Sequence, residues 1–394
     1  MEQDNDLLLR IRWWSYQRQR LGQAAASMEE VLQDVVGVYS SHPSAPLSLL
    51  ARTAAFSPEA FRALDLEKKA VRIPAMRRAI YLLLAEDAAF VFAATRENNE
   101  RLMKHLDYAA RYSKHEHLSR ETYPQLKAAL LAAAQEPLTP KQLGQALNQA
   151  KGTAMMAHFL GYEGATLRIG AHSLRSNSLR YVSTEAWGIE LQCELSPEEA
   201  RRQLAYRYFR AFGPASVRDF RWWAGIPANA AAAAVAQLET VALPNGLLLL
   251  AEDLAAFEQV TPPPADAIDI LPIWDSYTMG YAPSGHARQI EPAMQAHVYN
   301  NPTREGGDGI GSVLLAGKMV ASWSSTFTGN HFNVTLDLFD TTAEAHMSTI
   351  QARFEEIATA LGGTTCTITP HDPSALPLAV AKNRMHSAAS RKQQ

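Results

Sequence analysis

The chain has little of what marks a secreted, membrane-spanning or metal-centred protein. Its 394 residues include only two cysteines, Cys193 and Cys366, which argues for a reducing compartment and against a disulfide or zinc framework. No segment reaches the ~18 uninterrupted apolar residues that a membrane span needs. The first residues are acidic and polar, unlike the positively charged start of a signal peptide. We therefore expect a cytoplasmic protein with no membrane partner and no metal.

A strong basic excess is missing as well. The formal net charge is −3, whereas a protein that holds nucleic acid over its whole surface is strongly basic. Any contact with nucleic acid must therefore come from a local basic patch. The apolar fraction of 47% and the charged fraction of 20% are typical of a globular protein. The length predicts two to four domains.

The most informative segment begins with a short, sharply bounded helix. Ser216 is placed to cap this helix and Asp219 to bond back to the Ser216 amide, while Gly225 ends it. An Ala-rich helix over 229–239 follows, and then two apolar runs within 241–250 that flank a Pro-Asn-Gly turn. A short helix, a longer helix and a hairpin, in this order, are typical of a winged helix.

The same order occurs twice more. Thr139, with Gln142 three positions later, predicts a second capping box, followed by a helix over 147–160 and strands over 166–169 and 179–182. Nearer the N-terminus, helices begin at Ser27 and Ser57, and runs 71–75 and 79–84 pair around Met76, Arg77 and Arg78. We therefore predict three tandem winged-helix domains, over residues 1–95, 96–195 and 196–262.

The character of the chain changes after a proline-rich linker at 261–264. Short β-type runs follow at 268–272, 311–315, 318–323 and 333–338, and a helix is expected over 342–361. The fold class is accordingly α+β, with a small antiparallel β-barrel and a terminal helix over 263–362. Residues 363–394 are expected to form a flexible tail.

Basic residues concentrate on the first two predicted hairpins. They are Arg72, Arg77 and Arg78 on the first, and Arg168, His172, Arg175 and Arg180 on the second. We add Arg218 and Arg221 on the short helix and Arg288 in the C-terminal region to this DNA-binding set. Phosphate contacts from such residues add affinity without sequence readout. The alternative is that they are ordinary solvated hairpin residues.

Three segments resemble the AlkZ-like DNA glycosylases, a bacterial family described as winged-helix DNA-binding proteins. The resemblance spans about 12–361 and rests on 71–77 with 82–87, on 213–227, and on 270–275 leading to 279–281. It implies a C-shaped array of three winged helices closed by a β-barrel around a channel for duplex DNA. It also implies monofunctional excision of bulky or cross-linked N-alkylated purines in DNA repair, without a metal or an organic cofactor.

The chain departs from this family at its polar positions. The family's catalytic dyad, a Gln-aliphatic-Gln or Gln-aliphatic-Asp motif, falls on Tyr39 and Ser41 here. The histidine of the family's first wing is Tyr81, and its Asp-Arg pair in the barrel is Pro283-Ser284. A glycosylase must stabilise a sugar cation and orient a water molecule. These changes therefore predict poor excision.

Other residues could carry the chemistry instead. His42, beside Ser41, and Asp275 are possible substitutes for the dyad, and Tyr277, His286 and Arg288 lie on the segment expected to face the channel. His115 and His117 have no further ligands at a recognisable spacing, so we expect surface residues there. At least one of Trp222 and Trp223 is expected to pack the short helix rather than stack on a base.

The sequence leaves three functions open. The first is a monomeric protein that binds duplex DNA, damaged or bent, on a glycosylase scaffold that has lost excision. The second is an active DNA N-glycosylase with a rearranged site. The third is a winged-helix transcription regulator with a ligand-binding barrel, which an inducer-sized apolar pocket in the barrel would favour.

Overall fold

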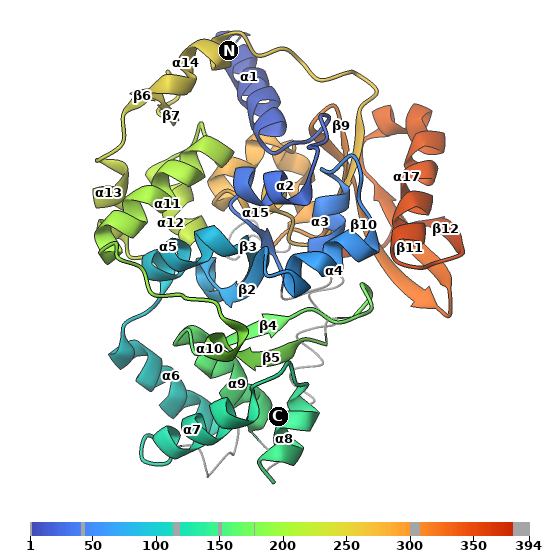
Figure 1. Cartoon of the computed structure of the whole chain (residues 1–394). Helices are drawn as coiled ribbons and strands as arrows, with labels where there is room; N and C mark the ends of the chain where they lie inside the picture. Colours follow the sequence, from blue (N-terminus) through green and yellow to red (C-terminus); the bar gives the residue numbers. More distant parts are fainter. Residues whose placement is uncertain are drawn as a thin grey trace.

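The computed structural model describes residues 2–40, 44–112, 119–148, 152–176, 178–299 and 308–380 (Figure 1). At its centre is a five-stranded sheet with the strand order β1-β3-β2-β4-β5. Its strands are Val38–Tyr39 (β1), Ala70–Pro74 (β2), Ile80–Leu84 (β3), Thr166–Ile169 (β4) and Arg180–Ser183 (β5). The two predicted hairpins, β2–β3 and β4–β5, are thus present. They join in one sheet because β2 pairs with β4, with Arg72 opposite Arg168.

Helices cover both faces of this sheet. One face packs on α2 (Met28–Asp34), α3 (Ala45–Leu50) and α4 (Pro58–Leu66), and the other on α5 (Ala85–Thr95) and α11 (Pro197–Phe212). The predicted helix starts are confirmed, because the side chains of Ser27 and Ser57 accept hydrogen bonds from the amides of Glu30 and Ala60. Most of the sheet is therefore buried on both sides.

A helical layer lies beyond β4 and β5, in the lower part of Figure 1. It contains α6 (Asn99–Tyr112), α7 (Tyr123–Ala133), α8 (Pro140–Ala146), α9 (Thr153–Tyr162) and α10 (Thr184–Trp187). The capping box of Thr139 and Gln142 is confirmed. The helix predicted over 147–160 begins only at Thr153, since Asn148 and Gly152 have positive φ angles of 50° and 83° that interrupt it. His115 and His117 lie outside the described residues.

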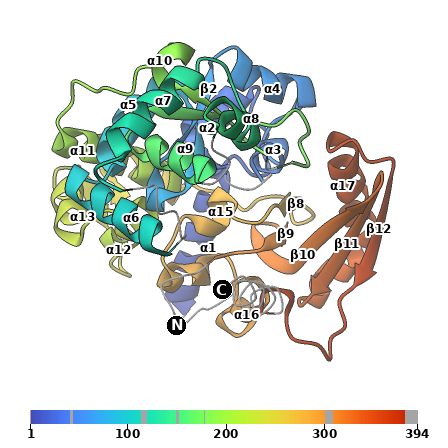
Figure 2. The same cartoon turned by 90° about the horizontal axis from the view of Figure 1, so that it is seen from below.

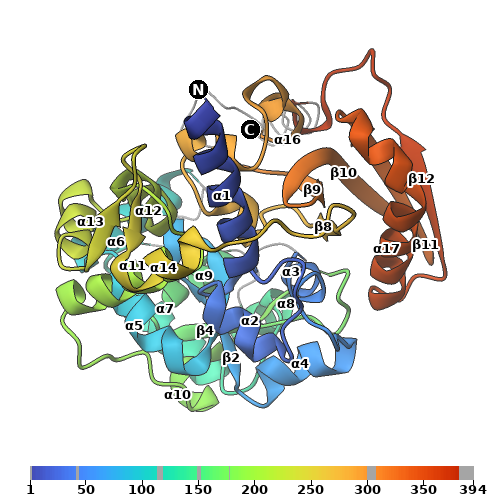
Figure 3. The same ribbon diagram turned by 90° about the horizontal axis from the view of Figure 1, so that it is seen from above.

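The third unit follows the predicted order. Helix α11 leads to α12 (Val217–Ala224), α13 (Ala228–Val235) and the hairpin of β6 (Thr240–Ala242) and β7 (Leu248–Leu250). The Ser216 and Asp219 capping box forms, and Gly225 ends α12 in the left-handed conformation at φ 72°. Helix α14 (Leu254–Glu258) then packs against α1 (Glu2–Arg18). Seen from above, α1 lies between α11–α13 and the C-terminal strands (Figure 3).

The C-terminal region is an open sheet rather than the predicted barrel. Its strand order is β12-β11-β10-β9-β8, so β8 and β12 are edges that do not pair with each other among the described residues. The strands are Ile268–Leu271 (β8), Gly311–Leu315 (β9), Lys318–Thr328 (β10), His331–Leu338 (β11) and Thr365–Pro370 (β12). Because β12 runs parallel to β11, the sheet is mixed. Residues 365–370 therefore belong to the sheet and not to a tail, while 381–394 lie outside the described residues.

Helix α17 (Met347–Ala360) packs on this sheet, which lies to one side of the molecule when seen from below (Figure 2). Two short helices, α15 (Ser276–Met279) and α16 (Gln295–Val298), lie between β8 and β9 in the chain. The 3₁₀ segments are Met76–Arg78 (η1), Ala251–Asp253 (η2), Pro283–Arg288 (η3), Pro292–Met294 (η4) and Thr341–His346 (η5). Among the described residues no helix is long and apolar enough to cross a membrane, and no group of acidic, histidine or cysteine side chains could hold a metal ion.

Candidate functional site

A pocket of about 190 Å³ opens at the tip of the β2–β3 hairpin. We call it the aromatic pocket, and the residues that line it are Tyr39, Met76, Arg77, Ala79, Tyr81, Trp274, Met279 and Asp308. The Tyr39 ring centroid lies 6.1 Å from that of Tyr81 and 4.9 Å from that of Trp274. Three aromatic rings from separate parts of the chain therefore form one wall.

Strand pairing and a close backbone contact build this pocket. Tyr39 lies directly opposite Tyr81 in the antiparallel β1–β3 register, so both side chains project from the same face of the sheet. At the hairpin tip, Arg77 and Arg78 have positive φ angles of 53° and 60°. A Cβ atom at Gly225 would lie 2.8 Å from the backbone of Arg77, so the end of α12 fits against the tip only with glycine there.

Trp274 is held in an unusual conformation. Its φ angle of 58° is rare for a bulky residue, and such outliers gather at functional sites because the surrounding structure has to enforce them. The Trp274 amide donates to the Gly309 carbonyl at 3.1 Å. Directly after it, Asp275 is completely buried and is fixed by the network described next.

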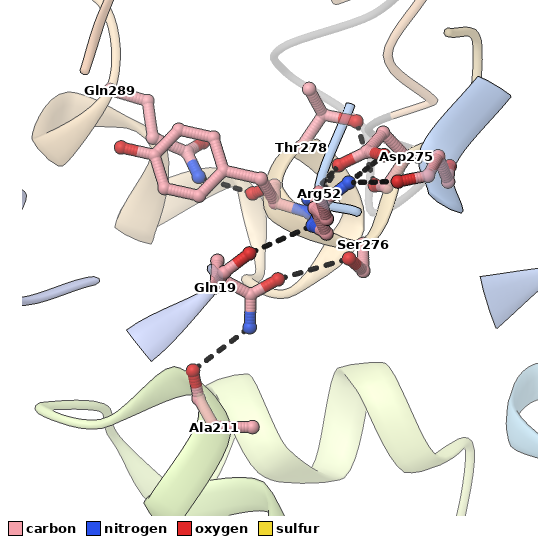
Figure 4. A network of polar contacts seen from close by, with 9 residues as sticks. Gln19, Arg52, Ala211, Asp275, Ser276, Thr278 and Gln289 are labelled. Carbon is pink, nitrogen blue, oxygen red and sulfur yellow. Dashed lines mark hydrogen bonds and ion pairs between the residues drawn. The ribbon is translucent and has the colours of Figure 1, made fainter. Parts of the chain in front are cut away.

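A buried ion pair anchors this turn (Figure 4). Two guanidinium nitrogens of Arg52 lie 2.8 and 2.7 Å from the two oxygens of Asp275. The Ser48 hydroxyl and the Tyr277 amide also donate to the same carboxylate. Asp275 was a candidate substitute for the catalytic dyad, and this is corrected here. A fully buried carboxylate with all its oxygens engaged cannot accept a proton from a substrate, and its role is to hold the backbone next to Trp274.

The same network joins distant parts of the chain. The Gln19 side chain donates to the Ala211 carbonyl and accepts from the Ser276 hydroxyl, both at 2.9 Å, while the Gln19 backbone carbonyl accepts from Arg52 (Figure 4). Residues near the ends of α1 and α11 are thereby tied to the segment between β8 and β9. This segment carries Trp274 and Met279, two of the residues that line the aromatic pocket.

The charged groups of the aromatic pocket are Arg77 and Asp308. Arg77 Nη2 lies 3.7 Å from Asp308 Oδ1, and the Arg77 guanidinium carbon lies 4.0 Å from the centroid of the Trp222 ring. Burial raises the pKa of Asp308, and the positive charge of Arg77 opposes this shift. Burial also raises the pKa of Tyr81, so its phenol stays protonated at neutral pH.

The comparisons with known proteins identify a family by sequence and a fold by structure. The sequence profile described as DNA glycosylase AlkZ-like matches residues 32–362. The chain belongs to the AlkZ-like DNA glycosylase family. Among solved structures, the Streptomyces sahachiroi DNA glycosylase AlkZ is similar, with a TM-score of 0.68 and 18% sequence identity over 92% of this chain and 98% of that one. This likeness shows the shared fold. No curated protein sequence matches the chain.

The three segments that carry the AlkZ-like resemblance meet at the aromatic pocket. The first supplies Met76 and Arg77, the second supplies Trp222 beneath the Arg77 guanidinium, and the third supplies Trp274 and Met279. Of the two dyad positions, Tyr39 lines the pocket from β1. Ser41 and its neighbour His42 lie outside the described residues.

Two of the arginines predicted to contact DNA are buried instead. The Arg72 guanidinium pairs with Asp65 and donates to the Ser40 hydroxyl at 2.9 Å. Arg288 donates to the Pro214 carbonyl at 2.7 Å, and its guanidinium carbon lies 3.8 Å from the centroid of the Tyr281 ring. Only 3% and 2% of these residues is exposed. In this conformation neither charge can reach a phosphate, because each holds interior elements together.

The second hairpin makes contacts that the sequence does not reveal. Arg175 donates to the carbonyls of Leu361, Gly329 and Gly362, and so fastens the hairpin loop to the C-terminal sheet and the end of α17. The Arg180 guanidinium bonds to the Gly170 carbonyl within its own hairpin.

Arg168 differs from these residues. Burial lowers its pKa, and the only groups that act against this are the phenols of Tyr181 and Tyr39. Arg168 Nη2 is buried and has no hydrogen-bond acceptor among the described residues. Arg168 is thus a partly buried cation with no acidic partner in the described part of the chain. This arrangement favours the binding of an anion.

The remaining predicted residues divide between surface and core. His172, Arg218 and Arg221 are exposed. His286 and Tyr277 were expected to face a channel, but both are completely buried. His286 stacks on Tyr299 with ring centroids 3.6 Å apart, and burial lowers its pKa to about 4. Trp223 is buried, which confirms that one tryptophan of the pair packs α12.

A second hollow, of about 260 Å³, shares Arg77 with the aromatic pocket. We call it the arginine hollow, because five arginines line it: Arg77, Arg78, Arg96, Arg101 and Arg201. Glu97 is the one acidic residue among those that line it, and it lies 2.9 Å from His105. Arg96, Arg101 and Arg201 were not among the residues predicted to bind DNA, since they lie outside the predicted hairpins. The signal that could have identified two of them is a pair of arginines at the junction of α5 and α6, because Arg96 follows α5 directly and Arg101 lies in the first turn of α6.

Proposed function

We propose that this chain binds duplex DNA with the surface that carries the arginine hollow and the aromatic pocket, and that it recognises damaged or bent duplex. The observation that carries the proposal is the gathering of five arginines around one hollow in a chain of net charge −3. Membership of a DNA glycosylase family supports DNA as the partner. Arginines at this density contact phosphates and add affinity without sequence readout.

The free charges of the hollow are those of Arg96 and Arg101. Both residues are exposed, and neither guanidinium has an ion pair or a hydrogen bond among the described residues. Arg78, by contrast, donates to a ring nitrogen of His105 at 2.8 Å, and Arg201 donates to the Ala94 carbonyl at 3.3 Å. Arg96 and Arg101 are therefore the pair with which to test the proposal without loosening the fold.

The test is the double change Arg96→Gln and Arg101→Gln. We expect the slope of log affinity against log salt to fall by up to about two units, one for each lost phosphate contact. We expect the free energy of unfolding to change by less than about 0.5 kcal/mol, as is usual for exposed side chains. The measurement is a titration of labelled duplex at several salt concentrations, together with a denaturant curve.

The control is the double change Arg120→Gln and Arg353→Gln, at two half-exposed arginines outside the proposed surface. It removes the same charge, so an equal loss of affinity in both doubles would show a general charge effect and count against the hollow. Recognition of bent DNA is tested with a duplex that contains a central two-nucleotide bulge, which should bind more tightly than intact duplex. Equal affinity for the two duplexes would remove that part of the proposal.

A second candidate, a regulator that responds to a small ligand, has one observation in its favour. A cavity of about 480 Å³ lies between α3, β8 and α17, within the size range of small-molecule sites. Tyr16 donates to Asp269 at 2.5 Å in its wall, and burial raises the pKa of that carboxyl. A regulator would prefer one DNA sequence strongly over others, whereas phosphate contacts through the hollow would not.

A further inference from the structure

Among the residues that line the aromatic pocket, Asp308 is the only one with a carboxylate. The polar groups with which the family positions its attacking water are replaced at Tyr39, whose phenol is a weak base at neutral pH. A carboxylate that faces the same space can supply what the phenol lacks. We propose that Asp308 is a catalytic residue, whose carboxylate accepts a proton from the water that attacks C1′ of a damaged nucleotide seated in the aromatic pocket.

Asp308 differs from the other carboxylates that burial perturbs. Burial also raises the pKa of Asp87, Asp253 and Asp269. These three bind Arg207 at 2.6 Å, Arg18 at 3.3 Å and Tyr16 at 2.5 Å, respectively. Each of them is thus occupied by a structural partner and lies outside the aromatic pocket.

The Asp308 carboxylate remains open to a ligand. Its one ion-pair partner among the described residues is Arg77 at 3.7 Å, which is beyond hydrogen-bond distance, and 49% of the Asp308 side chain is exposed. The carboxylate oxygens can therefore accept a hydrogen bond from water. Burial raises the pKa of Asp308, which makes its carboxylate a better proton acceptor, while the Arg77 guanidinium opposes this shift and favours the ionised form that acts as the base.

The rest of the aromatic pocket suits a charged aromatic base. An engineered cavity of about 150 Å³ holds benzene, so a space of about 190 Å³ that opens to the surface admits one ring system. The faces of Tyr39, Tyr81 and Trp274 attract a cation, and a purine alkylated at N7 carries a positive charge. Extrusion of a base from the stack into such a pocket costs least when the base is damaged.

The step balances without a further reagent. The bond between C1′ and N9 breaks, and its electron pair neutralises the charge on the alkylated base, which leaves. A water oxygen forms the new bond to C1′, and its proton passes to the Asp308 carboxylate and then to solvent. The products are the free base and an abasic sugar, and no metal or organic cofactor takes part.

This inference rests on the proposed DNA binding, so the experiment measures binding and release separately. The substrate is a duplex with a single N7-methylguanine, incubated with an excess of protein. The variants are Asp308→Asn, Asp308→Glu and, as a matched control, Asp266→Asn at an exposed carboxylate that follows the 261–264 linker. For each variant, the affinity for undamaged duplex and the rate of base release are measured, beside a sample without protein.

We expect wild type to release the base above the protein-free rate, and Asp308→Asn to be slower by on the order of a hundredfold or more. Its affinity should be unchanged or higher, because a negative charge beside Arg77 is removed. Asp308→Glu should retain part of the rate, and Asp266→Asn all of it. Wild-type release should decline as acid protonates Asp308, whereas the residual release by Asp308→Asn should not.

Three results would overturn the assignment. They are wild-type release no faster than the protein-free sample, Asp308→Asn release equal to wild type, and a parallel loss of affinity and release in Asp308→Asn. The first of these, with tight binding retained, removes excision and leaves the DNA-binding proposal standing. Failure of wild type to bind duplex at any salt concentration removes both.

Discussion

Two arginine–aspartate pairs lie near Trp274, and they are built in opposite ways. In the Arg52–Asp275 pair two nitrogens bond to two oxygens, no part of either side chain is exposed, and two further donors complete the carboxylate. In the Arg77–Asp308 pair one contact of 3.7 Å joins side chains that are 29% and 49% exposed. The first pair is saturated and holds the fold. The second is unsaturated and can still bind something else.

The largest expected effect comes from breaking the saturated pair. Asp275→Asn leaves the Arg52 cation buried without its counter-charge, so the free energy of unfolding should fall by about 3–5 kcal/mol. Asp308→Asn, at the unsaturated pair, should change it by less than about 0.5 kcal/mol. Urea unfolding of both variants measures the difference. Similar losses of the free energy of unfolding in the two variants would contradict the distinction between the two pairs.

Acid should also destabilise the fold, through the buried side chain of His286. Burial lowers the pKa of His286 to about 4 from an ordinary 6.5, so the unfolded chain binds the proton first as pH falls. Stability is therefore lost between about pH 6.5 and pH 4, by about 3 kcal/mol for a shift of this size. His286→Phe keeps an aromatic ring against Tyr299 and should flatten this dependence. Unfolding midpoints measured between pH 4 and pH 7 would show it, and an unchanged slope would contradict it.

The smallest expected effect is on the affinity for DNA, when Arg77 of the exposed pair and its neighbour Arg78 are replaced. Arg77→Ala with Arg78→Ala removes two half-exposed guanidinium groups, so the salt slope should fall by up to about two units. The loss should be the same for two duplexes of unrelated sequence, because phosphates carry no sequence information. Titrations of both duplexes test this. A loss confined to one sequence would favour the regulator.

Local signals in the sequence predicted much of the fold. The caps at Ser27, Ser57, Thr139 and Ser216 each begin a helix, because a hydroxyl three residues before an amide is a short-range interaction. The pairing of β2 with β4 and the open C-terminal sheet were not predicted. Both depend on contacts between distant strands, which the chain order does not specify.

The sequence predicted only part of the candidate site, again because the chain order does not specify contacts between distant residues. Tyr39, Tyr81 and Arg77 were identified from the sequence and do lie together in the structure. The roles predicted for Asp275 and Arg72 were wrong. The sequence does not distinguish a charged residue that is exposed on a loop or hairpin from one that is paired in the interior. Asp308 was not identified from the sequence. Its distinguishing feature is that it lines a pocket with Tyr39, Arg77 and Tyr81, which are more than two hundred positions away in the chain.

The contact between Gly225 and Arg77 bears on how such a protein can change over evolution. The tip of the first hairpin is set by a glycine from the third unit, at a distance that excludes any side chain. The three units therefore resemble modules but are not interchangeable, since replacing the third by an equivalent from elsewhere would displace the wall of a pocket in the first. A change at the end of α12 therefore also alters the aromatic pocket, so these two parts of the chain have to vary together.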